Sequence, residues 1–438
     1  MKSYSRAMDY PQLESSLEKL LRAVSRSTAL ILERALSERD ISIDDAVQLF
    51  DADGSDLLAI IAAADALRAR TVGDVVTYVI NRNINFTNVC VKACGFCAFS
   101  RGHLAEQGYF LPVEEIIRRA TEAHELGATE VCVQAGLAPG MDGWHYVKLC
   151  RALKEALPDL HIHGFSPEEV LYGSTLTGAS IRDYLRALKD AGVGSLPGTS
   201  AEVLVDEIRK RVSPGRIATA QWIELIQTAH EVGIPTTSTI MYGHIESSLD
   251  KAVHLNILRE IQKHTGGITE FVPLSFVYEE APMFHRKPLP GLRHGASGAE
   301  VMKMYAVSRL MLNNYIPNLQ VSWVKEGPKL SQIALLGGAN DFGGTLINES
   351  ISTAAGAAYG QLMKPSQFRD LIREMGRIPA ERTTTYQKIR VFESEARHRD
   401  LLDEVNDPSQ RFGSYQNLIQ LKEYRFRDFY RDQKSAKP

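Results

Sequence analysis

The sequence predicts an α/β fold in which short strands alternate with longer amphipathic helices around a (β/α) barrel. Three observations lead to this prediction: the alternation itself, its continuation in one long run, and the lack of a G-x-G-x-x-G segment after the first strand. Strands that alternate with helices form parallel sheets. A long run of such units favours a TIM-type barrel, full or partial, over a doubly wound sheet.

Length and composition limit the class of protein. The chain has 438 residues, of which 44% are hydrophobic and 24% charged, so it is neither disordered, collagen-like nor a coiled coil. The formal net charge is -3, and we expect no nucleic-acid partner. Residues 1–12 are polar, and the longest apolar stretch, Leu57 to Leu67, contains Asp65 and is too short to cross a bilayer. We expect a cytoplasmic protein without membrane association.

Residues 1–72 are expected to form a helical N-terminal extension. Apolar residues recur at helical spacing from Ser25 to Leu36. Ser42 and Asp45 have the spacing of a helix cap, and an Ala-rich helix is expected from Leu57 to Arg68. No residue of this extension indicates chemistry.

Residues 73–386 are expected to hold the barrel. Several of its helices end at a glycine, which is the usual residue at a helix C-terminus. The expected strands are Val75–Ile80, Ile84–Thr87, Glu130–Gln134, His161–Phe165, Ser195–Leu196, Thr236–Met241, Glu270–Leu274 and Val321–Val324. The expected helices are Pro112–Leu126, Trp144–Leu157, Ile181–Ala191, Ala218–Val232, Leu249–Lys263 and Ala299–Asn313.

Residues 387–438 differ from the barrel in composition. They are dense in charges of both signs and also contain Tyr and Phe. Asp407-Pro408 is the clearest break in the pattern. We expect a charged helical tail on the outside of the barrel, with a solvated face.

Three cysteines are the most informative feature of the sequence. Cys90, Cys94 and Cys97 form a C-x3-C-x2-C pattern just after the first expected strands. A structural zinc takes four ligands, and only His103 lies close by in sequence as a fourth. An electron-transfer cubane uses four cysteines, so three thiolates leave one iron open for a substrate or cosubstrate. The pattern favours a catalytic 4Fe-4S cluster, with zinc or idle thiols as the alternative.

This pattern, with Phe96 before the third cysteine, resembles the signature of the radical S-adenosylmethionine (SAM) enzymes. In that superfamily the open iron chelates the amino and carboxylate groups of SAM. One electron from the cluster then cleaves SAM to a 5′-deoxyadenosyl radical. The resemblance implies a barrel of the radical SAM type, a 4Fe-4S cluster on Cys90, Cys94 and Cys97, bound SAM and an electron donor. The protein orients the cofactor and excludes competing reactions.

Further segments narrow the resemblance to one family. They are residues 83–88, 134–137, 161–169, 195–202 and 338–345. Together they are similar to the 5-amino-6-(D-ribitylamino)uracil–L-tyrosine 4-hydroxyphenyl transferases of deazaflavin (Fo) synthesis, over about residues 55–386. The alternative is a radical SAM enzyme of the futalosine route to menaquinone, whose members carry a Gly-rich segment in place of residues 197–200.

The resemblance implies a reaction and its partners. The deoxyadenosyl radical abstracts hydrogen from L-tyrosine, the Cα–Cβ bond of the tyrosine then breaks, and the resulting 4-hydroxybenzyl radical adds to C5 of 5-amino-6-(D-ribitylamino)uracil. The other products are 2-iminoacetate, methionine and 5′-deoxyadenosine. A sister radical SAM enzyme then closes the third ring of the chromophore and is a possible functional partner.

Residues at the expected strand ends complete the candidate site, because barrel enzymes act at the carboxyl ends of their strands. The superfamily binds the methionyl amino group of SAM with a Gly-Gly-Glu-like turn, where this chain has Gln134-Ala135-Gly136. The expected cofactor contacts are Phe96, Gln134, Gly136, His163, Ser166 and Glu202. The expected substrate contacts are Tyr242, His244, Glu246, Asn340 and Asp341.

Structural roles compete with several of these assignments. His163 could instead be a core histidine on its strand. Ser166 stands before a good first helical turn and could be its cap. Asp341 could close a turn. Arg209 or Arg211 could pair a carboxylate of SAM or tyrosine, although such arginines more often form salt bridges on a helix surface.

Overall fold

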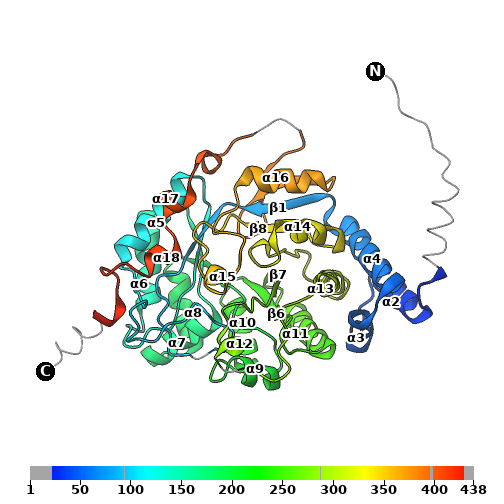
Figure 1. The fold of residues 1–438 in the computed structure, drawn as a ribbon, viewed down its shortest axis with the longest axis horizontal. Coiled ribbons are helices and arrows are strands. Elements are labelled where there is room, and N and C mark those ends of the chain that lie inside the picture. Colours follow the sequence, from blue (N-terminus) through cyan, green and yellow to red (C-terminus); the bar gives the residue numbers. More distant parts are fainter. Residues whose placement is uncertain (1–21, 93, 287, 395–397, 429–438) are drawn as a thin grey trace.

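The structure is a computed structural model that describes residues 22–92, 94–286, 288–394 and 398–428. Parallel strands form a ring at the centre, and helices surround it (Figure 1). The N-terminal helices and the C-terminal segment lie on opposite sides of this ring in the view of Figure 1. The fold is therefore the α/β barrel that the sequence predicts.

The strands of the ring pair in parallel groups that isolated bridges join. In ring order they are β1 (Val75–Val79), β2 (Asn81–Ile84), β3 (Glu130–Val133), β4 (His161–His163), β5 (Val193–Ser195), β6 (Thr236–Tyr242), β7 (Ile268–Ser275) and β8 (Asp341–Gly344). Leu196 bridges to Thr236 between β5 and β6. Phe271 bridges to Leu319 and Gln320 to Asp341, which connects β7 to β8. Because β8 pairs with β1, the ring is closed, as in a full barrel.

Helices follow the strands along the chain, and the longer ones surround the ring. These helices are α5 (Val113–Glu125), α6 (His145–Ala156), α7 (Pro167–Thr177), α8 (Ile181–Asp190), α9 (Asp206–Val212), α10 (Thr219–Glu231), α11 (Ser248–Thr265), α12 (Pro282–His285), α13 (Gly298–Leu312), α14 (Trp323–Ala334), η1 (Leu335–Gly337), α15 (Ile351–Ala354) and α16 (Pro365–Glu374). The sequence explains their ends: α11 starts in a capping box of Ser247 and Asp250 and stops at Gly266, which is left-handed. None of the described helices has the length and hydropathy needed to cross a membrane.

The N-terminal helices pack on one flank of the barrel. They are α2 (Arg26–Leu36), α3 (Ile43–Asp51) and α4 (Gly54–Val72), and they contact α11 and α13. Ser42 and Asp45 form the expected capping box of α3. The part of the expected helical extension before residue 22 lies outside the described residues.

The strand expected at Val321–Val324 is largely absent. Only the residues around Leu319 to Val321 take part in the ring, and α14 starts at Trp323. An apolar run this short fits a buried strand and a buried helix equally well, so its periodicity could not distinguish them.

Two strands extend the sheet beyond the ring. β9 (Ile378–Arg382) pairs parallel with β1, and β10 (Lys388–Val391) pairs antiparallel with β9. The sheet thus continues past residue 386, where we expected the barrel to end and a helical tail to begin. The alternation in β10 covers four residues within a charged stretch, which is too short for a period of two to stand out.

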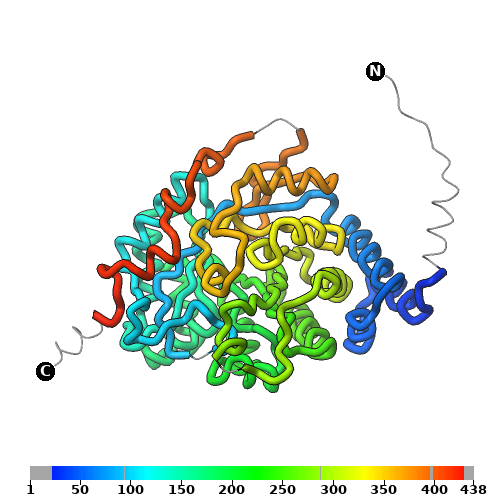
Figure 2. Tube along the Cα trace, viewed as in Figure 1, coloured from blue at the N-terminus to red at the C-terminus, as the bar shows by residue number. Residues whose placement is uncertain are grey.

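Residues 398–428 form what we call the C-terminal arm. Its regular elements are short helical turns: η2 (Leu401–Glu404), α17 (Pro408–Phe412) and α18 (Tyr415–Leu418). The arm runs beside α5 (Figure 2), and Arg411 forms an ion pair with Glu122 of that helix. Phe412, Tyr415, Leu418 and Phe426 are buried. These residues pack one side of the arm on the barrel, while many of its other side chains are exposed, as expected of a solvated face.

Candidate functional site

A cavity of about 400 Å³ lies inside the ring, and all three motif cysteines line it. At one end are Cys90, Cys94 and Cys97, which follow the carboxyl end of β2. At the other end are Arg382 and Thr384, which the β9 segment brings to the amino-terminal ends of the strands. We call this second end the floor of the cavity.

Backbone hydrogen bonds fix the cysteine loop, residues 85–101, to the strand ends. The amide of Val91 donates to the carbonyl of Leu137 at 2.9 Å, and the amide of Gly136 donates to the carbonyl of Thr87 at 2.8 Å. A Cβ on Gly136 would lie 2.3 Å from the carbonyl oxygen of Val89. Only glycine allows the two backbones to approach this closely.

The C-terminal arm lies against the far side of the cysteine loop. The amide of Phe110 donates to the carbonyl of Tyr424 at 2.8 Å, and the amide of Phe426 donates to that of Gly108 at 2.9 Å. The ring of Tyr415 packs on Phe99, with ring centroids 5.5 Å apart. The arm thus supports the stretch of chain that follows the third cysteine.

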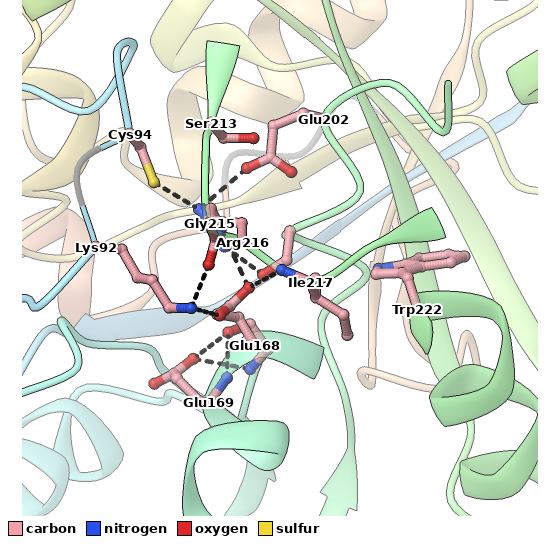
Figure 3. A network of polar contacts seen from close by, with 12 residues as sticks. Lys92, Cys94, Glu168, Glu169, Glu202, Ser213, Gly215, Arg216, Ile217 and Trp222 are labelled. Carbon is pink, nitrogen blue, oxygen red and sulfur yellow. Dashed lines mark hydrogen bonds and ion pairs between the residues drawn. The ribbon is translucent and has the colours of Figure 1, made fainter. Parts of the chain in front are cut away.

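An arginine contacts one of the cysteines directly (Figure 3). A guanidinium nitrogen of Arg216 donates to the sulfur of Cys94 at 3.5 Å and lies 3.1 Å from Glu202. Arg216 also pairs with Glu168 at 3.5 Å, and Lys92 pairs with the same carboxylate at 3.0 Å. The end of the cavity that holds the three cysteines is therefore lined by cations and carboxylates that pair with one another.

The electrostatics of this network favour a charged guanidinium. Burial raises the pKa of the Cys94 thiol to about 12, and Arg216 opposes that rise. Burial acts to lower the pKa of Arg216, but Glu202 and the neighbouring acidic groups outweigh it and raise the pKa. A cation beside the sulfur stabilises the thiolate form that binds metal.

Glu202 is held in a costly conformation. Its φ of 41° lies in the left-handed region, which non-glycine residues rarely occupy. Its Oε2 atom is buried and accepts no hydrogen bond in the described part of the chain, although a guanidinium nitrogen of Arg209 lies 3.8 Å away. A buried polar atom left unpaired costs about 1–3 kcal/mol, which a ligand with a hydrogen-bond donor could recover.

The expected cofactor contacts all line the cavity: Phe96, Gln134, Gly136, His163, Ser166 and Glu202. The side-chain amide of Gln134 donates to the hydroxyl of Thr199 at 2.6 Å. His163 contacts the hydroxyl of Ser195 at 2.7 Å, and burial lowers its pKa to about 4, so it is neutral at pH 7. Ser166 caps α7 in a capping box with Glu169, so the structural role predicted as its alternative is present.

The five expected substrate contacts do not line the cavity. Tyr242 is buried and donates to Glu326 at 3.3 Å. Thr237, Thr239 and Met241 line the cavity from the same strand, and Tyr242 points to the opposite face. We therefore do not retain Tyr242 as a substrate contact.

The other four hold turns and strand ends together. Glu246 accepts hydrogen bonds from the amides of Gly243 and His244 and pairs with Arg293, while His244 contacts the carbonyl of Met241. Asn340 accepts from the amide of Leu319 at 2.8 Å. Asp341 accepts from the amide of Gly343 at 2.8 Å, as in the predicted turn, and pairs with Arg382. These side chains are committed to the scaffold, so we no longer expect them to bind substrate.

Several cavity residues were not found by sequence reasoning. Arg216 lies on the loop between α9 and α10, where Pro214-Gly215 was the nearest sequence signal. Arg209, one of the two arginines considered, instead donates to the carbonyl of Ser200 at 2.9 Å and of Ile217 at 2.6 Å. Arg211, the other, donates to the carbonyl of Pro290 and does not line the cavity. The wall residues that we missed include Lys92, Lys325, Glu130, Glu270, Gln320 and Arg382.

The floor is polar. Arg382 pairs with Asp341 and lies 3.5 Å from Glu270. Burial raises the pKa of Glu270 to about 7, and Arg382 opposes the rise. Glu130 accepts a hydrogen bond from the side-chain amide of Asn81 at 2.7 Å. The floor can therefore offer both donors and acceptors to a polar ligand.

The donor set fits a cubane better than a single ion. Among the described residues, no three His, Cys, Asp or Glu side chains converge as ligands of one metal ion. His103, the fourth ligand that a zinc site would need, does not line the cavity. In a cubane each cysteine binds a different iron, so three cysteines that line one cavity without converging on a single ion suit it.

Comparisons with known proteins agree with this geometry. Residues 84–255 match the Radical SAM superfamily, and residues 265–395 match the CofH/MqnC C-terminal region. Two solved structures share the fold. Methylornithine synthase (PylB) has a TM-score of 0.62 and 18% identity, and the match covers 80% of this chain and 97% of that one. The FeFe-hydrogenase maturase HydG from Carboxydothermus hydrogenoformans has a TM-score of 0.63 and 15% identity, and the match covers 86% of this chain and 85% of that one.

Curated relatives are much closer in sequence. The 5-amino-6-(D-ribitylamino)uracil–L-tyrosine 4-hydroxyphenyl transferase of Methanothermobacter thermautotrophicus is 47% identical over 367 residues, which are 84% of this chain and 99% of that protein. That of Methanocaldococcus jannaschii is 48% identical over 353 residues, 80% of this chain and 97% of that protein. The chain therefore belongs to the radical SAM superfamily and, within it, to the family of 5-amino-6-(D-ribitylamino)uracil–L-tyrosine 4-hydroxyphenyl transferases.

Proposed function

We propose that this protein is a radical SAM transferase of deazaflavin (Fo) biosynthesis. It cleaves the Cα–Cβ bond of L-tyrosine and joins the 4-hydroxybenzyl group to C5 of 5-amino-6-(D-ribitylamino)uracil. The products besides the adduct are 2-iminoacetate, methionine and 5′-deoxyadenosine. The observation that carries the proposal is one cavity with the three motif cysteines at one end and a polar floor at the other.

The cysteine end would hold the cofactors. Cys90, Cys94 and Cys97 would bind a 4Fe-4S cluster, which supplies the electron that cleaves SAM to a 5′-deoxyadenosyl radical. Arg216 can contribute positive charge toward the carboxylate of SAM, because its guanidinium lies on the cavity wall beside Cys94, although its nitrogens already contact Cys94, Glu168 and Glu202. The unpaired oxygen of Glu202 can accept a hydrogen bond from the amino group or ribose of SAM. Support for these roles comes from the position of both residues on the same wall.

The floor would bind the pyrimidine. A ribityl chain and a uracil ring present several donors and acceptors, and Glu130, Glu270, Gln320 and Arg382 can match them. Neutral His163 can hydrogen-bond without adding charge. The closed ring excludes water from a reactive radical, which protects it from side reactions. An electron donor and the sister radical SAM enzyme would act with this protein as partners.

The test is an anaerobic assay of the reconstituted protein with reductant and SAM. Tyrosine and 5-amino-6-(D-ribitylamino)uracil are supplied together and singly, and the products are identified by mass spectrometry. We expect a benzylated pyrimidine only when both are present. Deoxyadenosine without adduct would show that the substrates are wrong, and futalosine-type substrates would be tested next.

Cysteine variants test the cofactor assignment separately. Cys94→Ala should abolish deoxyadenosine formation while the barrel still folds. Cys150→Ala is the matched control, because Cys150 is buried in α6 and does not line the cavity. Full turnover by the Cys94 variant would contradict the cluster assignment.

A further inference from the structure

One cation of the cavity lacks the partner that the others have. Lys92, Arg216 and Arg382 each form an ion pair with a carboxylate. The ammonium of Lys325 has no carboxylate oxygen within 4.0 Å in the described part of the chain, and its hydrogen bond goes to the hydroxyl of Ser352 at 3.1 Å. Lys325 lines the cavity, so this charge faces the space that a ligand would fill.

Lys325 lies at the end of the cavity that holds the three cysteines. It is in the first turn of α14, just after the residues that close the ring between β7 and β8. Burial lowers its pKa, while the nearby charges of Glu349, Glu326 and Cys97 act to raise it. A cation in such a place is unfavourable unless an anion neutralises it.

The acidic side chains nearest to Lys325 are buried, and burial raises the pKa of both Glu349 and Glu326. Glu349 accepts hydrogen bonds from the amides of Ser352 and Thr353, and Glu326 accepts from the hydroxyl of Tyr242. Neither side chain forms an ion pair with Lys325 in the described part of the chain. The polar groups around Lys325 instead leave its charge available to a ligand.

We propose that Lys325 binds the carboxylate of the amino-acid substrate, L-tyrosine. The inference rests on the proposed function and adds the residue that holds this substrate. The pyrimidine has no carboxylate, and Arg216 beside Cys94 is placed for that of SAM. The bond to be broken, Cα–Cβ, belongs to the amino-acid end of tyrosine, and the proposal places that end beside the cysteines. Lys325 holds that end near the cysteines and leaves the floor to the pyrimidine.

The experiment uses the reconstituted holoenzyme and three variants. Lys325→Met removes the charge, and Lys325→Arg restores a cation. Lys329→Met is the matched control, because Lys329 is exposed on the same helix. Tyramine, which is tyrosine without its carboxylate, is the probe for the interaction. Iron content, SAM affinity and the KM for tyrosine are measured for each protein.

We expect Lys325→Met to keep its cluster and its SAM affinity and to raise the KM for tyrosine about 10- to 100-fold, the effect of losing a hydrogen bond to a charged group. Wild type should prefer tyrosine to tyramine by a similar factor, and the variant should lose this preference. Lys325→Arg should recover part of the affinity, and Lys329→Met should resemble wild type.

Other outcomes overturn the proposal. An unchanged KM for tyrosine in Lys325→Met would do so, and so would a loss of SAM affinity with tyrosine binding intact, which would place the SAM carboxylate at Lys325. If the variant does not fold, equal binding of tyramine and tyrosine by wild type still refutes it. Failure of the proposed function looks different: wild type would then show no tyrosine-dependent product at all.

Discussion

A methyl group at position 136 tests how the cysteine loop is positioned. In Gly136→Ala the new Cβ would lie 2.3 Å from the carbonyl oxygen of Val89 and 2.8 Å from its carbonyl carbon. Ordinary contact starts at 3.4 Å, so one of the two backbones has to move by about 1 Å in a closely packed interior. Val89 directly precedes Cys90, and the movement therefore reaches the first cluster ligand.

The effect on stability should be small and the effect on activity large. Overpacking of a filled site costs about 1–3 kcal/mol, which for a chain of this length lowers Tm by only a few degrees. A misplacement of about 1 Å between reacting groups can reduce a rate about 100-fold. We expect Gly136→Ala to fold and to form deoxyadenosine about 100-fold more slowly than wild type.

The assay compares iron and sulfide content, the electron spin resonance of the reduced cluster, and deoxyadenosine formation. Gly102→Ala is the control near the same loop, because a Cβ on Gly102 meets no atom within 4 Å. It should behave as wild type. A Gly136→Ala enzyme with wild-type cluster content and rate would refute the idea that this close approach sets the position of Cys90.

Three further side chains, Tyr415, Arg216 and Glu326, can each be tested by substitution. Tyr415→Ala removes the ring that packs on Phe99, which costs about 3 kcal/mol of stability. We expect this variant to retain less iron than wild type, whereas Tyr415→Phe should retain the same amount. Equal iron content in the two variants would show that the arm does not support the cysteine loop. Arg216→Met leaves Glu202 and Glu168 without this cation, which lowers the free energy of unfolding by about 3–5 kcal/mol. Titration calorimetry should show that the affinity for SAM falls more than tenfold and that Arg216→Lys recovers part of it. Burial raises the pKa of Glu326 to about 8, so the wild-type fold loses stability as pH rises from the ordinary glutamate value of 4.5 to about 8. Glu326→Gln lacks this loss, and urea unfolding at pH 5 and pH 9 should show its relative stability increase by a few kcal/mol; a difference independent of pH would contradict the burial of a neutral carboxyl.

The fold was largely predictable because its signals are local. Cap residues such as Ser42 and glycines such as Gly266 mark helix ends in the sequence itself, and the structure has both. The elements that were missed have weak local signals. β10 is four exposed residues long, and the run Val321–Val324 is too short for its periodicity to separate strand from helix.

The substrate contacts were harder to predict because a barrel strand is buried on both faces. In β6 the residues Thr237, Thr239 and Met241 face the cavity, while Tyr242 packs outward beneath the helices. Alternation along the strand divides these residues into two sets, but nothing in the sequence says which set faces inward. A polar residue such as Tyr242 or His244 therefore looks like a ligand contact whichever face it occupies.

The three cysteines could be predicted from the sequence, whereas the cations around them could not. Cys90, Cys94 and Cys97 lie close together in the chain, so their spacing carries the chemistry. Arg216 reaches Cys94 across 122 residues, and only the closure of the ring brings them together. Arg216 and Lys325 both come from chain that follows a later strand end, which is where the eight-fold repeat of a barrel collects its catalytic loops. Because the cofactor chemistry is shared throughout the superfamily, we expect the residues that determine substrate specificity to lie on these loops. A cation on such a loop that forms no ion pair, such as Lys325 in the described part of the chain, indicates a site for a substrate carboxylate.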